Sequence, residues 1–299
     1  MVRQPGYGNV LDKIGNTPIV RLPIDTEATV LAKLEYLNPG GSIKDRAALF
    51  MIEDAERTGE LKPGGTIIEA SSGNQGIALA MIGALKGYNV AITVPDKTSD
   101  EKVATLRSYG ADVYVCPSSN DPDDPKGYHA KAAELLRTIE NSYTPNQYHN
   151  EQNPRAHYTA TGPEIWEQTN GTVTHFIAAK GTCGTVVGTG RFLKEQNPTI
   201  KVIAVDEAEA EEKPYKIEGI GIGIDANLDR SVVDDYIDVD GKDAFETIRQ
   251  FAKKHGILVG LSAGAVLYAL QSMLHELKPT DVVVFIIADS GRAYLNKLF

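Results

Sequence analysis

The sequence predicts an α/β fold with a largely parallel sheet that helices cover on both faces. Short apolar runs, suited to buried strands, alternate with longer segments in which apolar residues recur every three or four positions. Such alternation is typical of strand-helix-strand units, in which a crossover helix joins two parallel strands. The 299 residues, 42% of them hydrophobic, suffice for one large domain or two modest ones.

The predicted strands are short and apolar enough to be buried on both faces. They are Val30–Leu34, Thr66–Glu69, Asn89–Val94, Asp112–Cys116, His175–Ala179, Lys201–Val205 and Asp281–Ala288. The predicted helices share an apolar face with helical spacing. They are Asp45–Thr58, Gln75–Leu85, Asp100–Tyr109, Gly127–Ile139, Arg155–Gln168, Thr185–Glu195, Ala244–His255 and Ala263–Glu276. The polar stretch Glu207–Arg230, acidic at its start and rich in glycine in its middle, predicts a functional loop.

Charge and cysteine content exclude several classes of function. The net charge of −10 offers no basic surface for nucleic acid, and no apolar run approaches the roughly 20 residues that span a membrane. The first residues lack the apolar core of a signal peptide. Two cysteines, Cys116 and Cys183, form neither a disulfide framework nor a metal-ligand spacing. We therefore expect a cytoplasmic protein without a metal site.

The segment Asn38–Arg46 reads Asn-Pro-Gly-Gly-Ser-Ile-Lys-Asp-Arg and predicts a turn that leads into a helix. Ser42, followed three residues later by Asp45, indicates the helix start, which places Lys44 in the first turn. The positive end of the helix dipole disfavours a cation there and favours the neutral, nucleophilic amine that a Schiff-base lysine requires. Taken alone, the segment is more typical of a solvated lysine beside an ordinary helix cap.

Three further loops place small and polar residues at helix starts. Ser71–Gly76 and Gly181–Thr185 each follow a predicted strand and could hold a carboxylate or a phosphate on free backbone N–H groups. Gly260–Gly264 begins the last long helix and presents the Ser262 hydroxyl. Each loop by itself is also compatible with a simple strand-to-helix turn or a helix cap.

Together and in this order, the four motifs resemble the fold-type II pyridoxal-phosphate enzymes, whose tryptophan synthase β-like fold has two open, twisted, mainly parallel sheets flanked by helices. The resemblance is strongest to the cysteine synthase and cystathionine β-synthase family, and within it to the cysteine synthase B type, the O-acetylserine sulfhydrylases. The segments Ile14–Pro18 and Ala156–Trp166 add to it, so that it runs essentially from end to end.

The resemblance implies a role for each motif. Lys44 would carry the cofactor and act as the catalytic base, Asn74 would bind the ring's 3-oxygen, and Ser262 would bind the pyridine nitrogen. The cofactor phosphate would be bound by Gly181, Thr182, Cys183, Gly184 and Thr185. The substrate would be bound by Ser71, Ser72, Gly73, Gln75, Gln147 and Gly219. Lys180, Cys183 and Gln75 depart from the usual residues of the family.

The resemblance also implies a reaction and an organisation. A transferase of this kind replaces the β-substituent of an O-activated L-serine, here O-acetylserine, with sulfide to give L-cysteine through aldimine and aminoacrylate intermediates. Residues 41–150 would form a smaller mobile domain with the carboxylate loop, and residues 1–40 plus 151–299 a larger one with the phosphate loop. The cofactor would lie in the cleft between them. A homodimer that takes part in amino-acid biosynthesis is implied as well.

Several alternatives remain open. The segment Leu261–Gly264 is more similar to cystathionine β-synthases, which would make homocysteine the nucleophile. Serine or O-phosphoserine could be the donor, although the acidic loop Asp206–Glu212 lacks the arginine expected to pair with a substrate phosphate. Thiosulfate could replace sulfide. The unusual residues before and within the phosphate loop also leave room for a non-catalytic protein that binds a metabolite or a partner protein.

Overall fold

The computed structural model describes residues 8–119, 121, 124–209, 214–221 and 223–299. These residues form two compact units. The described parts of the smaller unit are residues 8–16, 38–40 and 44–146, and those of the larger unit are 17–37, 41–43 and 147–299. This division assigns residues 8–16 to the smaller unit, whereas the predicted boundaries place them in the larger one. Residues 210–213 of the predicted acidic loop lie outside the described residues.

The smaller unit is built on a four-stranded parallel sheet in the order β5-β4-β3-β6. Its strands are β3 (Thr66–Ala70), β4 (Asn89–Pro95), β5 (Asp112–Cys116) and β6 (Ser142–Tyr143). Its helices are η1 (Val10–Lys13), α1 (Lys44–Thr58), α2 (Asn74–Lys86), α3 (Asp100–Ser108) and α4 (Tyr128–Thr138). Ile67 of β3 packs with α1 and α2, and the next residue, Ile68, packs with α4. This alternation buries the sheet on both faces.

The larger unit has a six-stranded sheet in the order β1-β2-β10-β7-β8-β9. Its strands are β1 (Ile19–Arg21), β2 (Thr29–Leu34), β7 (His175–Ala179), β8 (Lys201–Glu207), β9 (Asp235–Val239) and β10 (Val282–Ile287). Only the pairing of β1 with β2 is antiparallel among these described strands. Its helical segments are η2 (Glu35–Leu37), α5 (Gln152–Ala156), η3 (His157–Thr161), α6 (Gly162–Gln168), α7 (Gly184–Gln196), α8 (Gly241–His255), α9 (Leu261–Met273), η4 (Leu274–Glu276), η5 (Gly291–Tyr294) and α10 (Leu295–Leu298).

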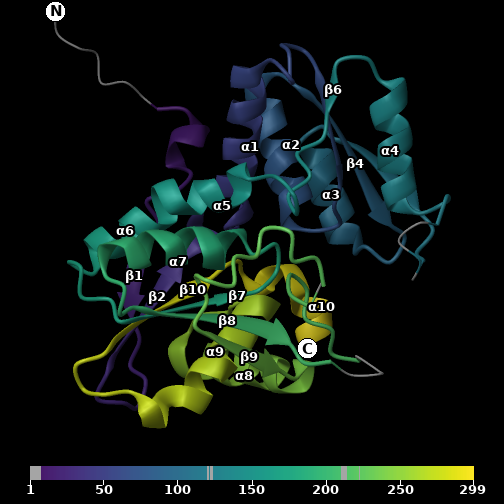
Figure 1. The fold of residues 1–299 in the computed structure, drawn as a ribbon. Helices are drawn as coiled ribbons and strands as arrows, with labels where there is room; N and C mark the ends of the chain where they lie inside the picture. The colour runs from purple at the N-terminus through teal and green to yellow at the C-terminus, as the bar shows by residue number, and fades with distance from the viewer. Residues whose placement is uncertain (1–7, 120, 122–123, 210–213, 222) are drawn as a thin grey trace, which may run out of the picture. The chain divides into compact units, whose positions relative to one another are not determined.

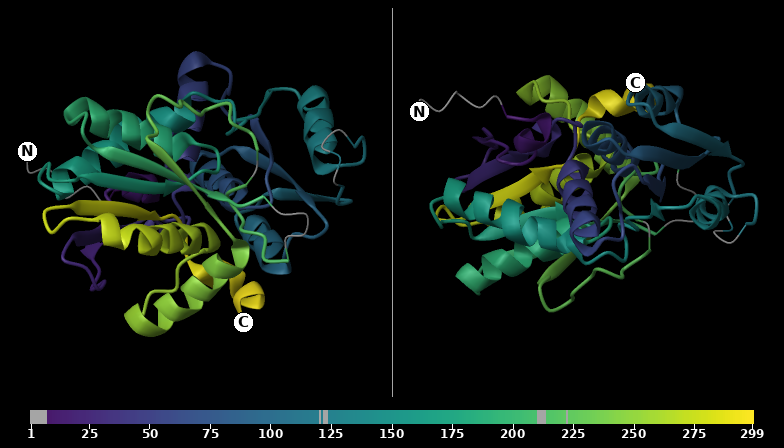
Figure 2. Two further views of the ribbon diagram at one scale, coloured as in Figure 1. Left: turned by 60° about the horizontal axis from the view of Figure 1, so that its bottom comes forward. Right: turned by 90° about the horizontal axis from the view of Figure 1, so that it is seen from above.

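Two helical layers cover this larger sheet (Figure 1). Phe285 of β10 packs with α8 and α9 on one face, whereas its neighbours Val284 and Ile286 pack with α6 and α7 on the other. Figure 2 shows the same arrangement from other directions, with α8 and α9 in yellow-green to yellow on one side and α6 and α7 in teal on the other. The predicted fold class, with two mainly parallel sheets flanked by helices, is confirmed.

The sequence predicts the main elements well and fails at short or irregular ones. The predicted helix Arg155–Gln168 is a correction, because it consists of α5, the π-helical turn η3 and α6. Pro163 lacks the N–H that a continuous helix would need at this point, which favours a local change of helical pitch. The strands β1, β6 and β9 were not predicted. Within the residues that the structure describes, every helix is too short or too polar to cross a bilayer.

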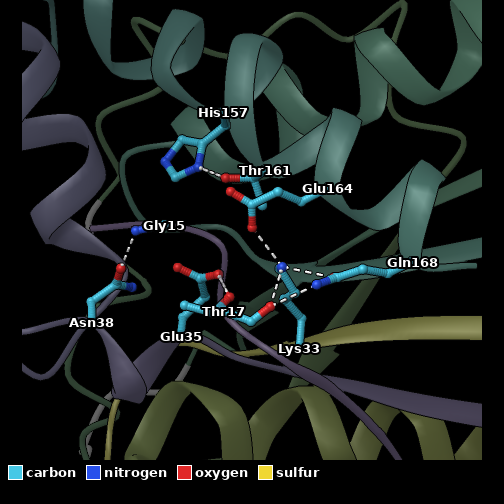
Figure 3. A network of polar contacts seen from close by, with 9 residues as sticks. All are labelled: Gly15, Thr17, Lys33, Glu35, Asn38, His157, Thr161, Glu164 and Gln168. Carbon is cyan, nitrogen blue, oxygen red and sulfur yellow. Dashed lines mark hydrogen bonds and ion pairs between the residues drawn. The ribbon is translucent and has the colours of Figure 1, made fainter. Parts of the chain in front are cut away.

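One charged side chain interrupts the apolar face that β2 turns towards α6 (Figure 3). The Lys33 side chain is fully buried, and its Nζ lies 2.6 Å from Glu164 Oε2, 2.7 Å from the Thr17 carbonyl oxygen and 2.9 Å from Gln168 Oε1. Gln168 Nε2 donates to the same Thr17 carbonyl at 2.9 Å. This network connects Thr17, at which the chain enters the larger unit, to β2 and α6.

Replacing Glu164 with alanine should lower the free energy of unfolding by about 3 kcal/mol, because the buried Lys33 ammonium loses a carboxylate 2.6 Å away that helps to compensate its desolvation. Urea unfolding followed by circular dichroism measures the change. Glu167→Ala is the matched control, since Glu167 is exposed on the same helix, and it should change stability by less than about 0.5 kcal/mol. Equal losses for the two variants would contradict a stabilising role for the Lys33 network.

Candidate active site

Lys44 is the first residue of α1 and so lies in the first helical turn, where the sequence places it, although the predicted helix range began at Asp45. The preceding turn is fixed from both ends within the smaller unit. Asn38 Oδ1 accepts from the Gly15 N–H at 2.8 Å (Figure 3), and the buried Asp45 carboxylate accepts from the Gly40 N–H at 2.5 Å. Lys44 itself is partly exposed. These hydrogen bonds fix the turn that precedes Lys44, which lies at the positive end of the helix dipole.

The predicted carboxylate loop connects β3 to α2. Ser71 Oγ accepts from the N–H groups of Gly73 at 3.4 Å and Gly76 at 3.3 Å, which closes the loop on itself. Gly76 is required here, because a Cβ at this position would lie 2.9 Å from the Ser71 carbonyl oxygen. Asn74 begins α2, and its N-cap Gly73 has no capping side chain. Ser71 therefore caps the Gly76 N–H from within the loop, and the positive end of the helix dipole would stabilise an anion bound at this loop.

Gln75 is the most unusual residue of this loop. Its side chain is 2% exposed, and neither its Oε1 nor its Nε2 has a hydrogen-bond partner among the described residues. A buried amide without partners is costly, and in native proteins it usually indicates a place where a ligand or an ordered water binds. Gln75 thus fits the predicted role in substrate binding, which stays a prediction.

The predicted phosphate loop connects β7 to α7. Cys183, the N-cap of α7, adopts a left-handed conformation with φ of 64°. In the described chain, the backbone N–H groups of residues 181–186 donate to no protein acceptor, and the first helical hydrogen bond runs from Val187 N to Cys183 O at 3.0 Å. A run of unpaired N–H groups at the positive end of a helix fits a phosphate dianion.

The structure brings this loop together with two other predicted residues of the larger unit. A Cβ on Gly181 would lie 2.1 Å from the Gly219 carbonyl oxygen, and a Cβ on Gly219 would lie 3.9 Å from Ser262 Cβ. Ser262 is the second residue of α9 and is 8% exposed. Gly181, Gly219 and Ser262, far apart in sequence, therefore lie close together in the larger unit.

Gln147 is linked to the same region through a residue that sequence reasoning missed. Asn153 Nδ2 donates to the Gln147 carbonyl oxygen at 2.8 Å and to Thr182 Oγ1 at 2.8 Å. Asn227, also missed, donates to the Gln147 carbonyl at 3.1 Å. The Gln147 side chain is buried, and its Oε1 has no partner in the described chain. Nothing in the spacing of these residues signals their contact.

Thr185, the last residue of the predicted phosphate loop, contacts a histidine that was also not predicted. The His157 ring nitrogens lie 3.3 Å from Thr185 Oγ1 and 2.9 Å from Thr161 Oγ1 (Figure 3 shows the second contact). His157 is almost fully buried. The histidine therefore orients the Thr185 hydroxyl from behind the loop.

The two unusual residues of the phosphate loop have protein partners or an apolar setting. Burial raises the pKa of the Cys183 thiol to about 11, and the Asp225 carboxylate adds to the effect, so the thiol stays protonated and unreactive at neutral pH. Burial alone would lower the pKa of Lys180, but hydrogen bonds to Asp206 and Asp225 outweigh it and raise that pKa. Both residues keep fixed protonation states in the physiological range.

The predicted residues thus form two groups. In the smaller unit, Lys44 and Asn74 begin α1 and α2, which pack on each other through Ala48, Ile52 and Leu79. In the larger unit, the phosphate loop, Gly219 and Ser262 come together, and Gln147 joins them through Asn153. The donors of residues 181–186 and the helix start at Asn74 fit pyridoxal phosphate and an anionic amino-acid substrate, respectively.

Several known proteins are similar to this chain over most of its length. Cysteine synthase B of Escherichia coli (strain K12) is 42% identical, with 95% of this chain and 93% of that protein covered. Cystathionine β-synthase of Apis mellifera is 40% identical over 97% of this chain, but the chain spans only 60% of that relative's length. The crystal structure of O-acetylserine sulfhydrylase isoform 3 from Entamoeba histolytica is 36% identical and covers 100% of this chain and 93% of that chain with a TM-score of 0.91.

A family model described as "Pyridoxal-phosphate dependent enzyme" matches residues 10–289. The match covers both units and every residue for which a role was predicted. It confirms the predicted cofactor and the predicted class of enzyme, and the similarity to cysteine synthases runs nearly from end to end. The chain belongs to the family of pyridoxal-phosphate dependent enzymes.

Proposed function

We propose that this enzyme makes L-cysteine by replacing the acetoxy group of O-acetyl-L-serine with sulfide. The observation that carries the proposal is the run of unpaired N–H groups in residues 181–186, packed against Gly219 and Ser262. This run can bind a phosphate, and the chain around it is 42% identical to a cysteine synthase B over nearly its full length. The similarity to cystathionine β-synthases covers a smaller share of those proteins, 60% in the example from Apis mellifera.

The residues that would hold pyridoxal phosphate are Lys44 through its amine, Asn74, residues 181–186 through their N–H groups, and Ser262 through its hydroxyl. When bound, the cofactor supplies an electron sink that stabilises negative charge at the α-carbon of an amino acid. A neutral serine beside the pyridine nitrogen, unlike an aspartate, leaves that nitrogen largely unprotonated. This moderates the sink and favours loss of the β-substituent.

The remaining chemistry belongs to side chains of this protein. The Lys44 amine would remove the α-proton of the bound amino acid and return a proton at the end of the reaction. The start of α2, with Ser72 and the unpaired amide of Gln75, would bind the substrate carboxylate. The second unpaired amide oxygen, on Gln147, would accept a hydrogen bond from a donor group of the bound substrate.

Purified protein supplied with pyridoxal phosphate should absorb visible light and form cysteine from O-acetylserine and sulfide. Product analysis by mass spectrometry separates the alternatives. Cystathionine from serine and homocysteine, with little cysteine from O-acetylserine, would overturn the proposed donor and nucleophile but not the class of enzyme. O-Phosphoserine is the third donor to test. Protein that fails to take up pyridoxal phosphate would overturn the proposal as a whole.

We further propose that the enzyme acts as a cytoplasmic homodimer. Cys116 and Cys183 are both buried, unpaired thiols, which supports a reducing compartment. The dimer rests on the family resemblance alone. Light scattering of the purified protein tests it, and a mass of one chain at micromolar concentration would contradict it.

A further inference from the structure

Lys180 connects three parts of the larger unit that meet at the phosphate loop. It directly follows β7, and its backbone N–H donates to the Val205 carbonyl of β8 at 2.7 Å. Its Nζ lies 2.8 Å from Asp206 Oδ2 and 2.8 Å from Asp225 Oδ1. The lysine side chain is 12% exposed and the Asp206 side chain 19%, so this ion pair is only weakly screened by solvent.

Two carboxylates at the end of β8, those of Asp206 and Glu207, hold the glycine-rich segment 217–221. Asp206 Oδ1 accepts from the Gly221 N–H at 2.9 Å, and the next residue, Glu207, accepts from the Ile217 N–H at 2.6 Å. Asp206 thus contacts Lys180 with its Oδ2 and the segment with its Oδ1. The segment is thereby tied to the end of β8 at both of its ends.

The position of this segment matters for the site, because Gly219 lies at its centre. The Gly219 carbonyl oxygen approaches Gly181 so closely that a Cβ there would lie 2.1 Å from it, and the Gly219 Cα faces Ser262. A shift of the segment by even a fraction of an ångström would therefore change the phosphate loop and the surroundings of the Ser262 hydroxyl. Packed contacts of this kind transmit displacement, since protein interiors have few voids.

We infer that Lys180 is a positioning residue for cofactor binding, which fixes segment 217–221 against the phosphate loop by pairing with Asp206 and Asp225. The inference rests on the proposed function, because it assigns to the loop a bound pyridoxal phosphate. Lys180 does not need to touch the cofactor. Without its charge, the Asp206 and Asp225 carboxylates would repel each other. They would also place uncompensated negative charge beside a loop that is proposed to bind an anion.

The test compares the affinity of the apoprotein for pyridoxal phosphate, measured by absorbance and fluorescence titration, in three variants. Lys180→Met keeps the length of the side chain and removes its charge, and it should raise the dissociation constant about tenfold, the scale on which supporting partners act in other ligand sites. Lys180→Arg should restore it to within about threefold, because the charge and its reach are kept.

Lys194→Met is the matched control. Lys194 also forms a partly buried ion pair, with Asp234 at 2.8 Å, but Asp234 accepts from the Val202 N–H of β8, whereas Asp206 accepts from the Gly221 N–H of segment 217–221. The Lys194→Met variant should lower thermal stability about as much as Lys180→Met does. Its dissociation constant for pyridoxal phosphate should stay within about twofold of wild type. A second measurement, the KM for O-acetylserine, should rise in Lys180→Met more than kcat falls.

Each outcome decides the inference. A dissociation constant for Lys180→Met within twofold of wild type would overturn it, and so would an equal loss of affinity in Lys194→Met, which would indicate a general effect of stability. Failure of Lys180→Arg to restore binding would exclude the ion pair as the cause. Wild-type protein that binds no pyridoxal phosphate would overturn the proposed function together with the inference, which distinguishes that failure from the others.

Discussion

Replacing Lys44 with alanine should lower kcat by at least about a thousandfold, because one side chain supplies both the covalent link to the cofactor and the base for the α-proton. The position of Lys44 as the first residue of α1, on a turn fixed through Asn38 and Asp45, supports this double role. Steady-state formation of cysteine measures the change. Reduction of the wild-type protein with borohydride should also add the mass of the reduced cofactor to the peptide that contains Lys44.

Lys86→Ala is the control for this variant. Lys86 belongs to α2 of the same unit and pairs with Glu56 at 2.8 Å. Because neither residue belongs to a predicted site, the loss of this partly buried pair should leave kcat within about twofold, although it should lower the free energy of unfolding by about 1 kcal/mol. Full activity of Lys44→Ala, or borohydride labelling of another lysine in wild-type protein, would disprove the assignment of Lys44.

The sequence was a good guide to elements whose pattern is strictly local. The apolar run that became β10 alternates between two cores in the structure, with Phe285 on one face and Val284 on the other, and such a run predicts a buried strand wherever it occurs. In contrast, β9 is an edge strand in which Asp235 and Asp238 flank Tyr236 and Ile237, and its pairing with β8 depends on long-range contacts. No local pattern separates such a strand from a polar loop.

The site shows the same division. Lys44, Asn74 and the loop Gly181–Thr185 stand in motifs whose residue types and order could be recognised along the chain. The residues that support these motifs could not be recognised from the sequence. Asn153 of α5 reaches Thr182, and Asp225 reaches Lys180, only because the fold brings both side chains to the residues that follow β7. A polar residue in a loop has many possible partners, and the fold alone selects one.

Lys180 illustrates why a departure from a family pattern needs a structure. In the sequence, a lysine before a phosphate loop suggests either an additional phosphate ligand or a surface residue. The structure shows that its charge is already neutralised by Asp206 and Asp225 at 2.8 Å each. A cation paired in this way attracts a nearby anion only weakly. Lys180 would therefore act by fixing the position of neighbouring residues. The distinction depends on carboxylates that lie 26 and 45 positions further along the chain.

The second large effect is expected at Gly181. Gly181→Ala should raise the dissociation constant for pyridoxal phosphate at least about tenfold and lower the free energy of unfolding by about 2 kcal/mol. Its new Cβ would lie 2.1 Å from the Gly219 carbonyl oxygen, which belongs to the backbone and cannot move aside by rotating a side chain. Segment 217–221 is held by Asp206 and Glu207, so the phosphate loop must give way instead. Cofactor titration and urea unfolding measure the two effects.

Gly190→Ala is the control that distinguishes an effect on cofactor binding from a general effect of overpacking. A Cβ on Gly190 would lie 2.8 Å from a methyl group of Val202 and 2.9 Å from one of Val232, so this variant should also overpack the core and lose stability. Gly190 lies in the interior of α7, away from the N–H groups of residues 181–186, and its substitution should change the affinity for pyridoxal phosphate less than about threefold. If both variants lost affinity in proportion to stability, the contact between Gly181 and Gly219 would have no specific part in binding. If only Gly181→Ala lost affinity, the close approach of these two backbones would be what shapes the phosphate loop.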